Sequence, residues 1–212
     1  MDIANLRQEY TRMGLSREDL TPDPIQQFQQ WFQDATLAEV SEPNAMTLTT
    51  VSQTGCPSVR TVLLKQVNQQ GFVFFSNYGS RKAQQIETNP NVAIHFLWKE
   101  IERQIKIEGK ASKISTDESL TYFRSRPRGS QIGAWCSVQS EVIDSREVLE
   151  EQFKAISQRF EADEIPLPEF WGGYRIIPDR FEFWQGRPNR LHDCFVYLPL
   201  DNHSWKIERL AP

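Results

Sequence analysis

The stretch Met46-Thr47-Leu48-Thr49-Thr50-Val51, a Thr54-Gly55 turn and the apolar run from Ser58 to Lys65 together decide the fold class. Apolar and polar residues alternate in the first run, which is the period of a half-buried strand. A further run from Gly71 to Ser76 is rich in Phe. The pattern predicts three strands joined by hairpins.

Strand and helix patterns continue beyond this core. We expect further strands at 92–98, 102–113, 173–177, 179–184, 193–198 and 205–210, and helices at 25–32, 81–88, 115–125 and 143–160. The helices do not alternate regularly with the strands. This order favours an α+β fold built on a mainly antiparallel, closed or nearly closed barrel. No GxGxxG motif follows a strand, which disfavours a Rossmann site.

The N-terminal residues form a separate segment. Ile3, Leu6, Tyr10 and Met13 recur at helical spacing and Gly14 ends the run, which predicts a short amphipathic helix. We interpret residues 1–20 as a mobile arm and residues 21–212 as a single domain, because 212 residues leave little room for a second one.

Composition excludes several classes of function. The 24 Lys and Arg against 28 Asp and Glu give a charge of −4, so no general attraction to nucleic acid or an anionic membrane is expected. No apolar run reaches the ~18–20 residues that span a bilayer, and the first residues lack a secretory pattern, which predicts a cytoplasmic protein. The three cysteines lack CxxC spacing and the three histidines lie far apart, so no disulfide framework and no metal site are expected.

Two polar clusters lie on the predicted strands and the helix that follows them. Arg60 and Lys65 lie at the two ends of an apolar strand and could frame a phosphorylated ligand with an apolar body. From Asn77 to Lys82 a strand leads into a helix, where free backbone N–H groups favour an anion and Ser80 would cap the helix. The alternatives are an ordinary strand with solvated ends and a helix cap followed by two surface cations.

Two more clusters lie further along the chain. The segment Tyr122 to Gln131 holds three arginines in five residues, and is either a second phosphate pocket or a solvated basic loop. Downstream, Arg190 and His192 would project from the same face of a strand, which would place a fixed cation and a titratable imidazole beside a bound ring. A histidine with a purely structural role is the alternative.

Together these stretches resemble the pyridoxine (pyridoxamine) 5′-phosphate oxidases, a family of flavin enzymes. The similarity runs from 3–10 to 205–212, and the segments 125–135 and 170–175 are highly specific. The resemblance implies an FMN-binding split β-barrel with flanking helices, and a homodimer with two FMN sites across the subunit interface. It also implies oxidation of pyridoxine or pyridoxamine 5′-phosphate to pyridoxal 5′-phosphate by O2, with H2O2 and, from the amine, ammonia as products.

The resemblance also implies roles for single residues, which fall into three sets. The flavin and its phosphate would be held by Arg60, Thr61, Val62, Leu63, Leu64, Lys65, Phe75, Ser76, Arg81, Lys82, Gln104, Gln139, Ser140 and Trp184. The substrate phosphate would be bound by Lys65, Tyr122, Arg126 and Ser130. Arg190 and His192 would flank the pyridine ring as catalytic residues, and Arg7 and Tyr10 would close over it as a lid.

One residue departs from the family pattern. The pattern continues Arg-Leu-His-Asp-Arg, whereas here Arg190-Leu191-His192-Asp193 is followed by Cys194. The missing arginine belongs to the flavin-contact set, so we expect a roughly ten- to hundredfold loss of FMN affinity unless another group compensates. We interpret Cys194 as a small buried hydrophobe, and a redox-active thiol beside a flavin is the alternative.

Two rival functions follow from the same residues. A non-catalytic split-barrel carrier or sensor of FMN or pyridoxal 5′-phosphate would keep the first two clusters but would not need the Arg190–His192 pair. A barrel that binds nucleic acid through its basic segment is disfavoured by the charge of −4.

Overall fold

The computed structural model describes residues 9–11, 14–161, 163–201 and 204–212. Within them, one antiparallel sheet is formed by β1 (Ala45–Val51), β2 (Pro57–Leu63), β3 (Gln66–Asn68), β4 (Gly71–Asn77), β5 (Asn91–Trp98), β6 (Arg103–Lys113), β7 (Trp171–Gln185), β8 (Asp193–Pro199) and β9 (Trp205–Leu210). The helices are α1 (Pro24–Leu37), α2 (Arg81–Thr88), α3 (Thr116–Ser125), α4 (Arg128–Cys136) and α5 (Arg146–Arg159), with 3-10 turns at Arg17–Asp19, Lys99–Ile101 and Pro188–Arg190. The predicted α+β class with a curled, split-barrel sheet is confirmed.

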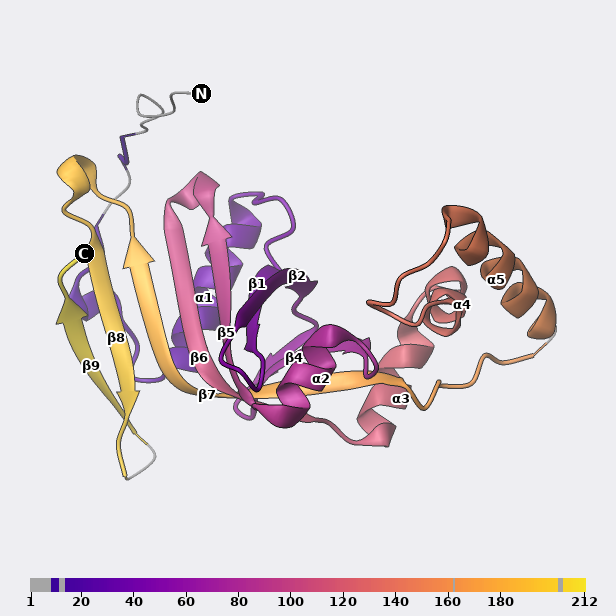
Figure 1. Ribbon diagram of the computed structural model, residues 1–212. Coiled ribbons are helices and arrows are strands. Elements are labelled where there is room, and N and C mark those ends of the chain that lie inside the picture. The colour runs from indigo at the N-terminus through magenta and orange to yellow at the C-terminus, as the bar shows by residue number, and fades with distance from the viewer. Residues whose placement is uncertain (1–8, 12–13, 162, 202–203) are drawn as a thin grey trace.

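The long strand β7 connects the two ends of the sheet. It pairs with β6 along most of its length, whereas its first half pairs with β4 and its second half with β8. Figure 1 shows the β8–β9 hairpin at one end of the molecule and the helices α3, α4 and α5 at the other. β7 therefore extends from the helical block to the C-terminal hairpin.

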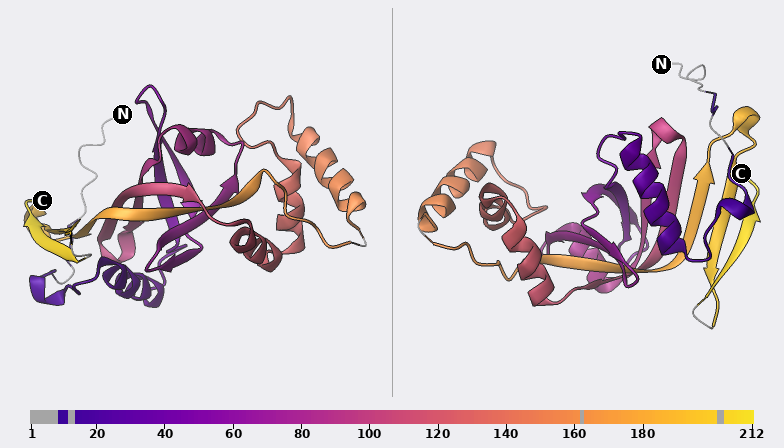
Figure 2. Two further views of the ribbon diagram at one scale, coloured as in Figure 1. Left: turned by 90° about the horizontal axis from the view of Figure 1, so that it is seen from below. Right: turned by 180° about the vertical axis from the view of Figure 1, so that it is seen from behind.

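Helix α1 covers the main core. Asp23 caps it by accepting a hydrogen bond of 2.8 Å from the Ile25 backbone N–H, and Pro24 occupies the first helical position, as the sequence predicts. Phe28 is fully buried, with ring centroids 4.9 Å from Phe72 and 5.1 Å from Phe96. Figure 2 shows α1 lying along one face of the curled sheet. Burial of such aromatic side chains contributes most of the stabilisation at this face.

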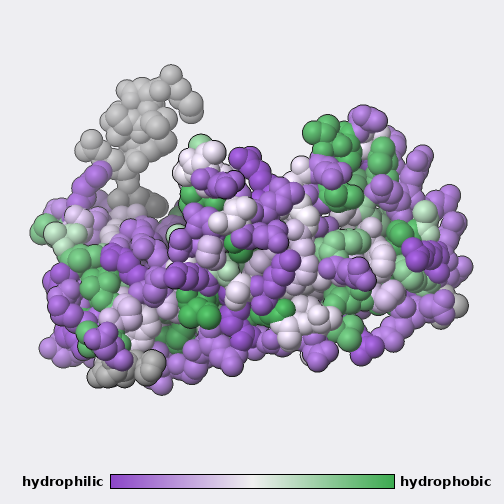
Figure 3. Space-filling model, turned by 60° about the horizontal axis from the view of Figure 1, so that its bottom comes forward, coloured by the Kyte–Doolittle hydropathy of each residue, from purple (hydrophilic) through white to green (hydrophobic). Residues whose placement is uncertain are grey.

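A second, smaller core lies under the helical block. Phe123 of α3, Ile132 of α4 and Phe160 after α5 are buried together with Trp171, the first residue of β7. The face of the molecule in Figure 3 is mainly hydrophilic, with hydrophobic side chains gathered in patches, one of them over this block. The two cores share β7 as their connection.

The structure corrects several sequence predictions. The predicted strands 173–177 and 179–184 form the single strand β7, which pairs with β6 on both sides of Pro178 and has its β-bulge at Asp179, the residue that β6 leaves unpaired. The predicted hairpin from 58–65 to 71–76 is wrong, since β4 pairs with the short strand β3 instead. Helix α4 was missed because Pro127, Gly129 and Gly133 are residues typical of loops.

The structure describes only part of the segment 1–20 that was predicted to be an arm. Of the predicted helix from Ile3 to Met13, the structure describes residues 9–11, which are not helical. Leu15 and Leu20 are buried in the main core, so the chain is packed against the sheet before residue 21. The boundary between arm and domain stays a prediction. In the part of the chain that the structure describes, we find no helix with both the length and the apolar character to cross a membrane.

Gly71 opens β4 at a position where a side chain cannot be placed. Its φ is +123°, and an added Cβ would lie 2.1 Å from the carbonyl oxygen of Ile176 on β7. We expect Gly71→Ala to lower the free energy of unfolding by about 3 kcal/mol or more, because it combines backbone strain with loss of β4–β7 pairing. Thermal or denaturant unfolding measures this.

Gly55 is the matched control for this substitution. It also has positive φ, +84°, but an added Cβ would meet no atom within 4 Å. We expect Gly55→Ala to cost only the backbone strain, about 1 kcal/mol. Equal losses in the two variants would contradict the steric argument.

Candidate ligand-binding site

A cavity of about 640 Å³ lies between β2, β4, the start of α2 and the helices α3 and α4. It brings together most of the residues predicted to hold a flavin and all four predicted to bind a substrate phosphate. These are Arg60, Thr61, Val62, Leu63, Lys65, Phe75, Ser76, Arg81, Lys82, Tyr122, Arg126, Ser130, Gln139 and Ser140. Four segments that are distant in the sequence therefore meet at one site.

The charged side chains that line this cavity are all positive among the described residues. Five of its lining residues are cationic, and none of the described residues that line it is Asp or Glu. The whole chain carries a charge of −4, so the concentration of positive charge is local. A cavity lined by cations without carboxylate partners favours an anionic ligand. The cations are Arg60, Lys65, Arg81, Lys82 and Arg126.

One end of the cavity is built around Lys82. Its side chain is buried, and its Nζ donates to Ser76 Oγ at 3.1 Å and to Gln139 Oε1 at 3.0 Å. Burial, together with the charge of Arg60, lowers the pKa of Lys82 to about 8. These partners are neutral oxygens, so the ammonium charge is not balanced within the site. A phosphate would balance it.

The loop after α4 completes this end. Ser140 Oγ accepts a hydrogen bond of 3.3 Å from the Arg81 backbone N–H, and Asn77 holds the loop by donating to the Ser137 carbonyl at 3.0 Å. Ser140 has a left-handed backbone with φ +79°, a strain that is typical of ligand sites. Ser80 occupies the N-cap position of α2, but its hydroxyl contacts Lys82 and does not cap the helix.

The other end of the cavity is built from aromatic rings and Arg126. Phe75 stacks on Tyr122, with centroids 3.9 Å apart, and on Trp171, 5.3 Å apart. The Arg126 guanidinium lies 4.6 Å from the Trp171 ring centre. Its Nη1 is buried and lacks a hydrogen-bond partner among the described residues. A buried donor without a partner is costly, and an anionic oxygen in the cavity would satisfy it.

The three arginines of the basic segment point in different directions. Arg124 pairs with Glu164 at 2.7 Å, and Arg128 donates to the backbone carbonyls of Phe160 and Asp163. Of the three, Arg126 is the one that lines the cavity. The segment for which a phosphate pocket and a solvated basic loop were the two alternatives forms the junction of α3 and α4, with Arg126 at the C-cap position of α3.

A second group of predicted residues lies at the opposite end of the molecule, near the start of β8 (Figure 1). The rings of Trp184 and His192 have centroids 4.5 Å apart, and Tyr10 packs edge-on against both at 5.6 Å. Gln104 of β6 lies opposite Trp184 of β7, and its Oε1 is hydrogen-bonded to His95 Nε2 at 3.1 Å. The predicted site residues therefore form two groups that do not meet within one chain.

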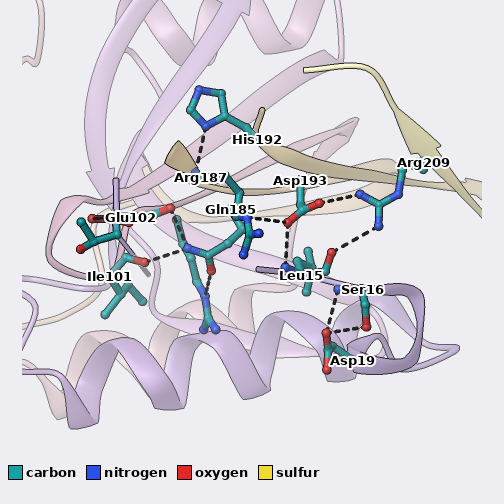
Figure 4. A network of polar contacts seen from close by, with 12 residues as sticks. Leu15, Ser16, Asp19, Ile101, Glu102, Gln185, Arg187, His192, Asp193 and Arg209 are labelled. Atoms are coloured by element: carbon teal, nitrogen blue, oxygen red, sulfur yellow. Dashed lines mark hydrogen bonds and ion pairs between the residues drawn. The ribbon is translucent and has the colours of Figure 1, made fainter. Parts of the chain in front are cut away.

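His192 is fixed in one tautomer by its neighbours. Its Nδ1 accepts a hydrogen bond of 3.1 Å from the Arg187 backbone N–H, so the neutral ring carries its proton on Nε2 (Figure 4). Burial and the charge of Arg190 lower the pKa of His192 below its ordinary value. The imidazole is accordingly neutral at pH 7.

The residues before and after His192 form a polar network (Figure 4). Asp193 accepts a hydrogen bond of 2.9 Å from the Leu15 backbone N–H and pairs with Arg209 at 2.6 Å. Glu102 accepts from the Thr11 backbone N–H at 3.0 Å. Thr11 and Leu15 are thereby attached beside His192, and Tyr10 is placed against its ring.

Four of the predicted site residues differ from expectation or cannot be placed. The prediction that Arg190 and His192 project from the same face of a strand is wrong. Pro188, the left-handed Asn189 and Arg190 form a 3-10 turn, and β8 begins only after His192. Leu64 faces the main core and does not line the cavity. Arg7 lies outside the described residues.

Sequence reasoning also missed some lining residues, notably Trp171 and Gly133. Trp171 lies within the Phe170–Arg175 segment that carried the resemblance, but that pattern gave no indication of which ring faces a ligand. Gly133 belongs to the helix α4 that was not predicted.

The fold and the cavity define a split-barrel protein with a cation-lined cavity. Residues 32–160 match the family described as "Pyridoxamine 5'-phosphate oxidase", and residues 171–212 match its "C-terminal dimerisation region". Proteins named "Pyridoxine/pyridoxamine 5'-phosphate oxidase" from Crocosphaera subtropica and Rippkaea orientalis are 63% and 62% identical, over the full length of this chain and of theirs. The chain belongs to the pyridoxine/pyridoxamine 5′-phosphate oxidase family.

Solved structures share this fold. PhzG from Burkholderia lata has a TM-score of 0.90 at 26% identity, covering 97% of this chain and 100% of its own. A protein from Nostoc punctiforme related to pyridoxamine 5'-phosphate oxidase has a TM-score of 0.73 at 16% identity, covering 91% of this chain and 100% of its own. The second similarity concerns the fold alone.

Lys82 makes the stability of the ligand-free protein depend on pH. Its pKa is about 8 in the folded state and 10.5 ordinarily, so the unfolded chain binds more protons between these values and stability rises with pH there. We expect ligand-free Lys82→Met to be more stable than the parent protein at pH 7. The difference should shrink between pH 8 and 10.5, as measured by unfolding at a series of pH values.

Lys110→Met is the control, because Lys110 is an exposed lysine of β6. We expect no comparable pH-dependent difference for it. A constant difference between Lys82→Met and the parent protein across this range would mean that the Lys82 ammonium is not destabilised by burial.

Proposed function

We propose that this protein is an FMN-dependent oxidase that converts pyridoxine or pyridoxamine 5′-phosphate to pyridoxal 5′-phosphate in vitamin B6 metabolism. The acceptor is O2, and the products include H2O2 and, from the amine, ammonia. The observation that carries the proposal is the cavity with five cations and no carboxylate among its described lining residues. Membership of the oxidase family supports the choice of ligands.

The two ends of the cavity suit two different phosphates. Lys82, Arg81 and Arg60, with the neutral donors around Ser76 and Ser140, would hold the FMN phosphate. At the other end, Lys65, Tyr122, Arg126 and Ser130 would bind the substrate phosphate. Each ring would be anchored by its own phosphate, which fixes their relative orientation. The buried Nη1 of Arg126, which has no hydrogen-bond partner among the described residues, supports this assignment.

A homodimer would complete the site. Trp184 lies 13 residues after Trp171 on β7, roughly 40 Å along the strand at about 3.3 Å per residue, so the two residues belong to opposite ends of the strand in one chain. The segment that matches the dimerisation region includes Trp184, Arg190 and His192. Exposed Val59 and Leu97 also support an apolar contact with a second copy. We propose that a second copy brings this group to the cavity.

FMN held by these residues would supply the redox chemistry, a two-electron oxidation of the substrate with O2 as the final acceptor. The protein's part is positioning and charge. Arg190 would bind the oxygen substituent of the pyridine ring, and the neutral His192, with its Nε2–H free of the Arg187 contact, would orient that ring. Tyr10 packs against His192 and would limit access of water, whereas the lid role of Arg7 stays a prediction.

Reconstitution with FMN tests the proposal directly. The purified protein should bind FMN and produce pyridoxal 5′-phosphate and H2O2 in equal amounts from pyridoxine 5′-phosphate. Bound FMN without either product would favour the carrier or sensor function. Failure to bind FMN would contradict the proposal as a whole.

Arg126→Ala tests the substrate phosphate site. Loss of a charge-assisted bond to a phosphate costs up to about 3 kcal/mol, so we expect KM for pyridoxine 5′-phosphate to rise by about two orders of magnitude. Steady-state kinetics with FMN-loaded protein measure it. Arg124→Ala, which removes an arginine directed at Glu164, is the matched control and should leave KM nearly unchanged. An unchanged KM in Arg126→Ala would move the phosphate site elsewhere.

Arg190→Met tests the assignment of the second group to the substrate. We expect turnover to fall on the order of a hundredfold or more, because a charge that stabilises the reacting ring is lost. FMN should stay bound, as shown by the flavin absorbance of the purified variant. A variant that loses its flavin would show that Arg190 serves the cofactor.

A further inference from the structure

The face of the sheet that carries Trp184 contains two adjacent rows of side chains. The strand register pairs Gln104 with Trp184 and Trp184 with Cys194. The next row consists of Lys106, Glu182 and Val196. Residues two apart on a strand share a face, so Cys194 lies diagonally opposite Glu182 on the face that carries Trp184.

Cys194 stands where the family pattern has an arginine, and it brings no charge. It is buried, with 3% of its surface exposed. Burial and the neighbouring Glu182 carboxylate raise the pKa of the thiol to about 12, so it stays protonated at neutral pH. The interpretation of Cys194 as a small buried residue agrees with this environment, and a reactive thiolate does not.

Glu182 is the acidic group next to this thiol. Its side chain is only 14% exposed, and its two oxygens are held by Lys106 Nζ at 2.7 Å and Arg180 Nη2 at 3.2 Å. Burial would raise the pKa of Glu182, but the bonds from these two cations outweigh it and keep the carboxyl ionised. Arg180 is shared with Glu108, at 3.5 Å. Of the two ion pairs that balance this buried carboxylate, the one with Lys106 is the shorter.

We propose that Lys106 supplies the positive charge that an arginine at position 194 would bring to this sheet face, and so maintains FMN affinity in this chain. An arginine at 194 would reach Glu182 from β8, whereas Lys106 reaches the same carboxylate from β6. Arg180 divides its charge between Glu182 and Glu108, so Lys106 is the cation that completes the neutralisation of Glu182 beside Trp184 and Gln104, the residues proposed to contact the flavin. The inference rests on the proposed function, because it places this face at the FMN site.

A comparison of single and double variants tests the inference. FMN dissociation constants are measured by fluorescence quenching with ligand-free protein, and melting temperatures are recorded in parallel. We expect Lys106→Met to weaken FMN binding about tenfold, which corresponds to ~1.4 kcal/mol. Adding Cys194→Arg to Lys106→Met should restore most of the affinity, while Cys194→Arg alone should change it little. Lys110→Met, on the same strand, is the control and should bind FMN like the parent protein.

Glu182→Gln provides a second, independent test that applies even if the larger arginine does not fit at position 194. With the carboxylate neutralised, adding Lys106→Met should no longer weaken FMN binding. The inference is overturned if Lys106→Met binds FMN like the parent protein, if it loses the same affinity in the Glu182→Gln background, or if only its melting temperature changes. Absence of FMN binding by the parent protein would instead contradict the proposed function, so the two failures are distinguishable.

Discussion

The pairing of β7 with three other strands is the constraint on which the arrangement of the site depends. The backbone of β7 is hydrogen-bonded to β6 along most of its length, to β4 in its first half and to β8 in its second half. The strand therefore cannot fold back on itself. Trp171 at its start lines the cavity, and Trp184 near its end stacks with His192. A continuous strand therefore holds the two groups of site residues apart within one chain, and the proposed chemistry, which uses both groups, calls for a second chain.

The cavity is costly for the ligand-free protein. Lys82 is buried next to neutral oxygens and within reach of the Arg60 charge, and the Nη1 donor of Arg126 is buried without a partner in the described part of the chain. Both features lower stability and become favourable only when anionic groups enter. The aromatic stack of Phe75, Tyr122 and Trp171 provides the rigid surroundings in which such a charge can be maintained. Stability is thus exchanged for affinity at this site.

The sequence predicts what is local and misses what depends on neighbours in space. Period-two alternation located β1 and β5 because each buries one face. The pattern could not reveal that Arg126 alone among three nearby arginines faces the cavity, since the turn between α3 and α4 decides it. The strand expected for Arg190 failed because Asn189 and Arg190 both have left-handed backbones, at φ 58° and 61°, which a hydrophobicity pattern does not report.

A sheet also changes what a lost motif residue means. Along the chain, Lys106 and Cys194 are 88 positions apart, and a linear comparison at position 194 detects only the absence of an arginine. In the folded sheet both residues flank Glu182, one from each neighbouring strand, so a positive charge on either of them can neutralise the same carboxylate. If Lys106 compensates as proposed, FMN affinity depends on the charge of this patch of the sheet face and not on the residue at a given position. Cross-strand register, which fixes which residues are neighbours, is what makes the two positions equivalent.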